Sequence, residues 1–143
     1  MKKLVLLTSM AFMAIIGHAQ TAVDINKVLE FKNADYNMGQ IQTGKASDYA
    51  VEIKNISKDT ITLITAKPTC GCTTPNFIPN QKVAPGQSTK VNISFNGSAT
   101  GPFTRTTDII FDKGLVKQVK FSGEGVAQVP APAPAGSPAP AKS

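Results

Sequence analysis

The sequence has 143 residues, with 15 lysines and arginines against 9 acidic residues and a formal net charge of +6. This length suits one domain with one hydrophobic core. The basic residues are scattered along the chain, and aromatic residues do not alternate with them as they do on surfaces that bind single-stranded nucleic acid. From this composition and charge distribution we expect no nucleic-acid partner.

The N-terminus predicts a secretory signal peptide over residues 1–19. Two lysines precede an apolar run that is shorter than the roughly 20 residues of a membrane-spanning helix. The small residues Gly17 and Ala19 favour cleavage before Gln20. We therefore expect a periplasmic or secreted protein, with no membrane span, processed near Ala19/Gln20. Its only histidine, His18, would be removed with the signal peptide.

After a short segment over residues 20–28, residues 29–127 predict an all-β domain. Apolar and polar residues alternate in short stretches, and residues that favour turns separate these stretches at intervals of about 8–12 residues. This pattern is typical of an immunoglobulin-like β-sandwich, here of about seven antiparallel strands. The predicted strands include residues 49–54, 60–66, 91–95, 104–111 and 115–122, with Val119 and Phe121 facing the core.

Several turns are predicted from local sequence. Pro85–Gly86 suits a tight turn, because proline fixes φ at the first central position and glycine supplies a positive φ at the second. Asp112–Gly114 predicts a hairpin turn, and a further turn is expected at Gly39. Pro68 ends the strand before it, and residues 69–79 are predicted to be irregular.

Residues 128–143 differ sharply in composition, since proline and alanine make up most of this segment. Proline fixes φ and removes backbone donors, and the segment offers nothing large to bury. We therefore expect a disordered, extended tail that serves as a spacer or as a proline-rich ligand for a partner domain.

One local feature suggests chemistry, the Cys70-Gly71-Cys72 segment. On a flat strand the Cα atoms of Cys70 and Cys72 would lie about 6.6 Å apart, so closing a disulfide would need the backbone to fold tightly at Gly71. Three interpretations stay open. The pair forms a local disulfide or stays reduced beneath a loop, it exchanges disulfides with other thiols, or its thiolates form a metal site for a soft ion such as Cu(I).

The exported chain lacks the residues of the common catalytic sites. Without histidine it has no Ser-His-Asp or Cys-His arrangement and no histidine metal site. Its carboxylates are predicted beside turns or at outward positions of strands, where nothing raises their pKa. We expect no enzyme activity and no cofactor other than the Cu(I) considered above. Asp59-Thr60-Ile61 matches an O-glycosylation pattern used by some Bacteroidota, which makes Thr60 a candidate acceptor.

The order of several motifs resembles one known family. Met38-Gly39 is followed by Pro68-Thr69-Cys70-Gly71-Cys72-Thr73, Pro85-Gly86-Gln87-Ser88, Gly101-Pro102-Phe103 and a closing Phe121-x-Gly123. Over residues 29–126 this arrangement resembles the DUF1573 family, a domain of unknown function in exported proteins of Bacteroidota and related groups. The resemblance implies an immunoglobulin-like sandwich related to modules that mediate protein contacts, and it implies no established activity.

We therefore interpret the chain as an exported, non-enzymatic immunoglobulin-like module for protein–protein or envelope interaction. Its expected partner is an envelope or extracellular protein, or a glycan, contacted through strand edges and loops. The alternative interpretation is a periplasmic thiol protein that binds Cu(I) or exchanges disulfides through Cys70 and Cys72.

Overall fold

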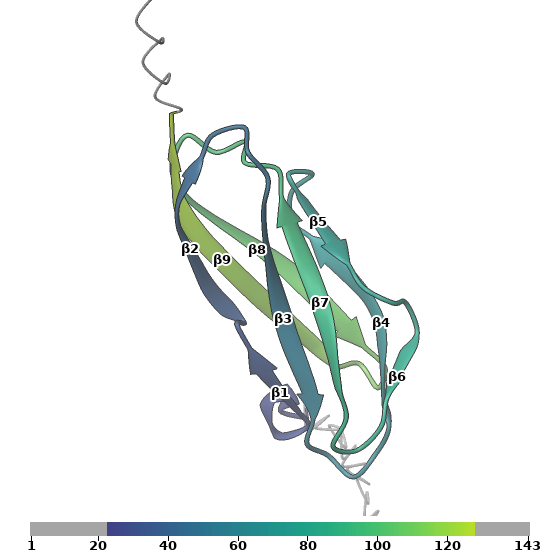
Figure 1. Cartoon of the computed structure of the whole chain (residues 1–143). Coiled ribbons are helices and arrows are strands. Elements are labelled where there is room, and N and C mark those ends of the chain that lie inside the picture. Colours follow the sequence, from purple (N-terminus) through teal and green to yellow (C-terminus); the bar gives the residue numbers. More distant parts are fainter. Residues whose placement is uncertain (1–22, 128–143) are drawn as a thin grey trace, which may run out of the picture.

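Nine strands form two facing sheets in the computed structural model, which describes residues 23–127 (Figure 1). Sheet A has the strand order β1-β3-β7-β5, and sheet B has the order β2-β9-β8-β4-β6. The strands of sheet A are β1 (Leu29–Lys32), β3 (Ser47–Asn55), β7 (Ser88–Phe95) and β5 (Thr73–Asn76). Those of sheet B are β2 (Asp35–Gln42), β9 (Val116–Val126), β8 (Gly101–Phe111), β4 (Ile61–Pro68) and β6 (Gln81–Val83). A 3₁₀ helix, η1 (Ile25–Lys27), precedes β1.

The core lies between the two sheets and follows from the alternation of apolar residues along each strand. Phe121 of β9 lies near its centre, with ring-centroid distances of 5.4 Å to Tyr49, 5.7 Å to Phe95 and 6.2 Å to Phe103. Tilted and edge-to-face contacts of this kind add to the free energy gained by burial. Val119 and Phe121 are both fully buried, which confirms the prediction that they face the core.

The structure confirms the all-β sandwich but changes the pairing of one strand. β2 lies beside β9 in parallel, with Asp35 opposite Lys120 and Gln42 opposite Val126, so the strands are not all antiparallel. Alternation shows which residues face the core, but it does not show the direction of the neighbouring strand. β1 and β2 are consecutive yet belong to different sheets, and the chain crosses between them at Asn33, which has φ 62.

Two local predictions also differ from the structure. Gly39 does not end a strand, because β2 continues through it with a register shift between Asn37 and Gln40. Gly39, with φ 67, therefore lies in a β-bulge and not in a turn. Residues 69–79 are not wholly irregular, because they contain the four-residue strand β5. The alternation of apolar and polar residues does not reveal β5, because the strand is short and contains a proline, which is unusual in a strand.

The buried side chain of Asn55 holds the end of the sandwich opposite the cysteine pair. It donates to the carbonyl oxygens of Asp59 at 2.7 Å and Val83 at 2.8 Å, and it accepts from the N–H of Ser57 at 3.0 Å. Because its donors and its acceptor are all hydrogen-bonded, this buried amide links the connecting loops at this end without the penalty of an unsatisfied polar group. The turn predicted at Pro85–Gly86 lies nearby and is confirmed, since Gly86 has φ 76.

The predicted signal peptide (residues 1–19) and the predicted tail (residues 128–143) lie outside the described residues. Export of the protein and disorder of its tail therefore stay predictions. Within residues 23–127, no helix has the length and apolar character needed to cross a membrane.

Candidate functional site

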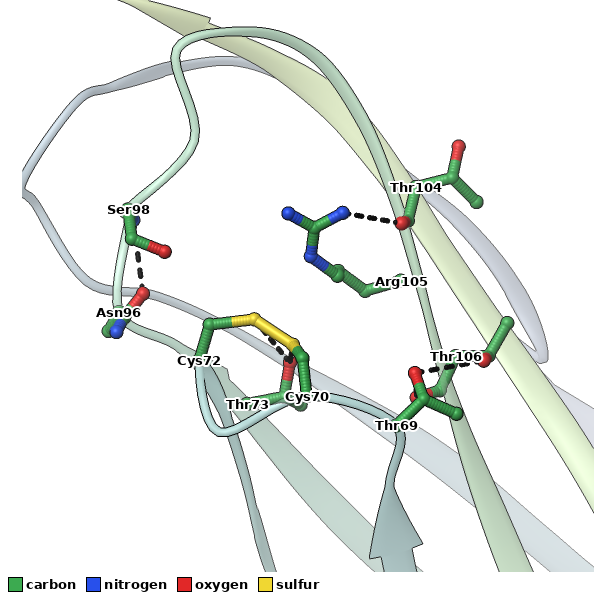
Figure 2. The surroundings of a disulfide bond; sticks show 9 residues. All are labelled: Thr69, Cys70, Cys72, Thr73, Asn96, Ser98, Thr104, Arg105 and Thr106. Atoms are coloured by element: carbon green, nitrogen blue, oxygen red, sulfur yellow. Dashed lines mark hydrogen bonds between the residues drawn. A yellow bond between two sulfur atoms is a disulfide. The ribbon is translucent and has the colours of Figure 1, made fainter.

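The cysteine pair lies where the chain crosses from one sheet to the other. Cys70 follows β4 of sheet B, Cys72 precedes β5 of sheet A, and their sulfurs form a disulfide (Figure 2). Both cysteines are half-buried, while Gly71 between them is exposed. The disulfide therefore closes a short surface loop, in agreement with the first of the three interpretations of the pair.

The ring closes through a turn and does not depend on glycine. Thr73 donates its backbone N–H to the carbonyl oxygen of Cys70 at 3.4 Å, and the Cα atoms of the two cysteines lie 5.3 Å apart. Gly71 has no positive φ, and a Cβ there would meet nothing within 4 Å, so the expectation that closure needs glycine is wrong. A ring of three residues constrains the unfolded chain little and contributes only about 1.6 kcal/mol to stability.

Two side chains that the sequence did not single out lie close to the disulfide. The hydroxyl of Thr73, a residue only 3% exposed, lies 3.6 Å from Sγ of Cys70 and 3.8 Å from Sγ of Cys72. Arg105 occupies an inward position of β8, because the residues two before it and two after it are buried. Its side chain extends into the space over the disulfide in Figure 2. Its Nη1 donates to the carbonyl oxygen of Thr104 at 2.9 Å, while its buried Nε has no partner within the described residues.

The metal site predicted at Cys70 and Cys72 requires the reduced pair. Within residues 23–127, no three His, Cys, Asp or Glu side chains come together, which leaves the two thiolates as ligands. Two-coordinate binding suits Cu(I) and not the four-ligand geometry of zinc. Cu(I) binding therefore stays a prediction for the reduced protein.

Other polar candidates from the sequence lie on the surface. Thr60 is exposed just before β4, and its glycosylation stays a prediction. The Glu52 carboxylate lies 3.0 Å from the ammonium of Lys90 and 4.0 Å from that of Lys32. The hydrogen bond from Lys90, and then its charge, lower the pKa of Glu52. Such a carboxylate suits an ion pair on an outer sheet face and not the donation of a proton.

Strand edges are the other predicted contact sites, and β5 forms one edge of sheet A. The N–H of Asn96 donates to the carbonyl oxygen of Cys72 at 3.0 Å. Because backbone groups point alternately toward and away from the neighbouring strand, this bond fixes which residues of β5 face β7. Thr73 and Pro75 therefore direct their backbone groups away from β7. Proline has no N–H, and the N–H of Thr73 is already used in the cysteine turn. The outer edge of β5 consequently offers no free donor at these two positions.

β2 forms an outer edge of sheet B, and two hydrogen bonds near its ends set which backbone groups face β9. Lys120 donates its N–H to the carbonyl oxygen of Ala34 at 2.7 Å, and Thr43 donates its N–H to that of Val126 at 2.9 Å. In a parallel pair, alternate residues of a strand direct both backbone groups to the neighbour. The residues of β2 that face away from β9 are Asp35, Asn37, Gln40 and Gln42.

These outward backbone groups of β2 are nearly all open. Among residues 23–127, only the Gln42 carbonyl oxygen has a backbone partner, the N–H of Lys45 at 3.0 Å, and no strand pairs with this edge. A row of unpaired N–H and C=O groups is a template for another chain, so the edge can accept an added strand. The bulge at Gly39 divides the edge into two short halves.

A shallow depression of about 480 Å³ lies on sheet B beside this edge. Phe103 and Gly123, which pair across β8 and β9, contribute to its lining. A Cβ at Gly123 would lie 2.8 Å from the carbonyl oxygen of Gly39 and 2.9 Å from the Phe103 ring, so this close approach requires glycine. The rim is polar and includes Asn37, Gln40, Thr104, Ser122 and Glu124.

This architecture defines an immunoglobulin-like sandwich, and solved structures of the same fold agree with it. The chain is similar to PapD-like domain 7 of human CEP192, with a TM-score of 0.56 at 13% identity, over 72% of this chain and 88% of that domain. A Porphyromonas gingivalis protein of unknown function gives 0.58 at 20% identity, over 68% of this chain and 46% of that one. The secreted serine protease VesC of Vibrio cholerae gives 0.58 at 14% identity, over 75% and 25%. At these identities the likeness shows the fold alone.

Residues 29–124 match the family described as "Protein of unknown function (DUF1573)". The chain belongs to this family, which confirms the resemblance found in its motifs. No curated protein matches the chain. Since neither the fold nor the family description assigns an activity, the function has to be inferred from the residues of the site.

Proposed function

We propose that the domain is a non-enzymatic binding module of the cell envelope that takes up an extended segment of a partner protein along the outer edge of β2. The observation that carries this proposal is the row of unpaired backbone groups beside a depression on the same sheet. Backbone hydrogen bonds would supply affinity, and the depression would supply specificity by receiving a side chain of the partner.

The depression favours a partner side chain that donates hydrogen bonds. Glu124 is the charged residue of its lining, and the side-chain amide of Gln40 lies 3.4 Å from the Glu124 carboxylate. Lys120, near the start of the edge, is paired with Asp35 at 2.9 Å, so its positive charge is compensated. A lysine or arginine of the partner would therefore find a carboxylate acceptor on the rim.

Two further considerations support the proposal. The predicted signal peptide over residues 1–19 directs the protein to the periplasm or beyond, where envelope proteins are the available partners. The chain also spans 46% of the Porphyromonas gingivalis protein and 25% of VesC. Sandwiches of this fold thus occur within longer chains, one of which is the secreted protease VesC.

Photo-crosslinking from two of the outer strands, β2 and β5, tests the proposal. A photoreactive amino acid replaces either Gln40 on β2 or Thr74 on β5 in the full chain, produced in its source cell. We expect an adduct with one envelope protein from position 40 and none from position 74, because of these two strands only β2 has free outward backbone donors among residues 23–127.

A backbone variant provides the matched control. Gln42→Pro removes an outward N–H, and we expect it to lower the adduct yield from position 40 about tenfold, since added strands bind by such groups. Gln42→Ala changes the same side chain but keeps the N–H, and it should leave the yield unchanged. An equal yield in both variants, or the same adduct from position 74, would contradict binding along β2.

A further inference from the structure

The disulfide loop is held in place by bonds other than the disulfide. Thr69, just before Cys70, bonds the carbonyl oxygen of Thr106 through its N–H at 3.1 Å and its hydroxyl at 3.0 Å. On the other side of the loop, the carbonyl oxygen of Cys72 accepts from the N–H of Asn96 at 3.0 Å. The loop is anchored to β8 and β7 on either side of the cysteines, so reduction of the pair leaves both anchors in place.

A buried hydroxyl faces both sulfurs. The Thr73 hydroxyl lies 3.6 Å from Sγ of Cys70 and 3.8 Å from Sγ of Cys72, and the described residues offer it no other hydrogen-bond partner. Sulfur in a disulfide is a weak acceptor, whereas an ionised acceptor such as a thiolate binds a donor strongly. Because a buried hydroxyl without a strong partner is unfavourable, Thr73 gains an interaction when the pair is reduced.

One cationic side chain belongs to the surroundings of the same loop. The Arg105 side chain extends from β8 over the disulfide (Figure 2), and no ion pair within residues 23–127 includes it. Its buried Nε also lacks a hydrogen-bond partner in this part of the chain. A positive charge near a cysteine stabilises the thiolate. Thr73 and Arg105 therefore both favour the reduced pair.

We propose that Cys70 and Cys72 form a thiol–disulfide exchange site for a protein dithiol. This function is separate from strand binding along β2 and does not rest on it. Cys72 packs against the hydrophobic core, whereas Cys70 does not. We therefore assign the attack of an incoming thiolate to Sγ of Cys70.

The exchange balances in two steps. A thiolate of the partner forms a disulfide with Cys70, the Cys70–Cys72 bond breaks, and its electron pair leaves on Cys72 as a thiolate that faces the Thr73 hydroxyl. The second thiolate of the partner then attacks the partner sulfur of the mixed disulfide and releases Cys70. Two electrons pass to the cysteine pair, the partner becomes a disulfide, and the protons of its thiols neutralise the released thiolates. In the reverse sequence the reduced pair returns two electrons to a partner disulfide, which becomes a dithiol, and the Cys70–Cys72 bond forms again.

Equilibration with glutathione tests this proposal. The full exported chain is held at varied ratios of reduced to oxidised glutathione, and its reduced fraction is read from the mass added by alkylation. We expect Thr73→Val to shift the equilibrium about tenfold toward the disulfide, because the reduced pair loses its hydroxyl donor. Arg105→Gln should shift it in the same direction.

Two matched variants control for structural effects. Thr73→Ser keeps the hydroxyl and should give the wild-type equilibrium, and Thr74→Val, at the next and exposed position of β5, should leave the equilibrium unchanged. Circular dichroism confirms that each variant is folded. A pair that stays oxidised at every glutathione ratio overturns the proposal, as do equal equilibria for wild type, Thr73→Val and Arg105→Gln.

A rate measurement identifies the attacked sulfur. Cys72→Ser leaves the thiol of Cys70, and Cys70→Ser leaves that of Cys72, and each variant is mixed with a chromogenic aromatic disulfide as the probe. We expect the Cys70 thiol to react about tenfold faster, because Cys72 packs against the core. A faster reaction through Cys72 would overturn the assignment of Cys70 as the attacked residue.

Discussion

β5 and β2 are both outer strands of the sandwich, yet one edge is closed and the other is open (Figure 1). On β5, Pro75 occupies an outward position, and the N–H of Thr73 is bonded within the cysteine turn. On β2, the outward positions include Gln40 and Gln42, whose N–H groups have no partner among residues 23–127. The residue types at a few outward positions, more than the length of a strand, decide whether its edge can accept another chain.

The outer faces of the two sheets also differ, in whether their carboxylates are paired with positive charges. On sheet A, Glu52 lies between Lys32 and Lys90, so neighbouring strands compensate each other's charges. On sheet B, Glu124 lies on the rim of a depression, and its one side-chain contact in the described part of the chain is with the amide of Gln40. The Glu52 carboxylate of sheet A is therefore already paired, while the Glu124 carboxylate of sheet B remains an acceptor for a partner.

The largest expected effect comes from filling the space beneath the open strand. Gly123→Ala places a Cβ 2.8 Å from the Gly39 carbonyl oxygen and 2.9 Å from the Phe103 ring. We expect the free energy of unfolding, measured in urea, to fall by about 2–3 kcal/mol. Gly71→Ala is the matched control, because its Cβ meets nothing within 4 Å, and it should change stability by less than about 0.5 kcal/mol. Equal losses in the two variants would contradict the close packing under β2.

Proline substitutions compare the backbone directions of the two strands at a smaller cost. Thr74 directs its N–H to β7, so Thr74→Pro removes an internal bond, and we expect a loss of about 2 kcal/mol. Gln42→Pro removes an outward N–H and should cost less than about 1 kcal/mol. Urea unfolding measures both, with Thr74→Ala and Gln42→Ala as side-chain controls. The assigned alternation is wrong if Gln42→Pro proves the more damaging change.

The smallest expected effect concerns the ion pairs on the outer face of sheet A. Lys90 holds the pKa of Glu52 below its ordinary value of 4.5 in the folded protein. This pair therefore stabilises the protein above that pH, and its contribution is lost as pH falls through the lowered pKa. Thermal unfolding should show a slight advantage of wild type over Glu52→Gln at neutral pH that disappears in acid. Glu30→Gln, without an ion pair among residues 23–127, is the control, and a pH-independent difference for Glu52→Gln would contradict this account.

The sequence predicts best the features that a single residue or a short repeat determines. Pro85–Gly86 forms the expected turn, because proline and glycine each restrict or permit one value of φ. Val119 and Phe121 face the core, because side chains alternate along a strand. The disulfide between the two cysteines matches one of the three interpretations. The sequence could suggest it because the two residues are close together in the chain.

Features that depend on contacts between distant residues were not predictable in this way. The parallel pairing of β2 with β9, and the requirement for glycine at Gly123, arise from neighbours brought together by the fold. The hydroxyl of Thr73 meets both sulfurs only because the loop turns. Arg105 did leave a signal, since it occupies an inward position of a strand where a charged residue is unusual.

Amide hydrogen exchange along β2, followed residue by residue by NMR, most directly tests the central claim that this edge is unpaired in the folded protein. Ile41 and Thr43 direct their N–H groups to β9, whereas Gln40 and Gln42 direct theirs outward. We predict that the amides of Gln40 and Gln42 exchange on the order of a hundredfold faster than those of Ile41 and Thr43. Equal protection of all four amides would contradict the account.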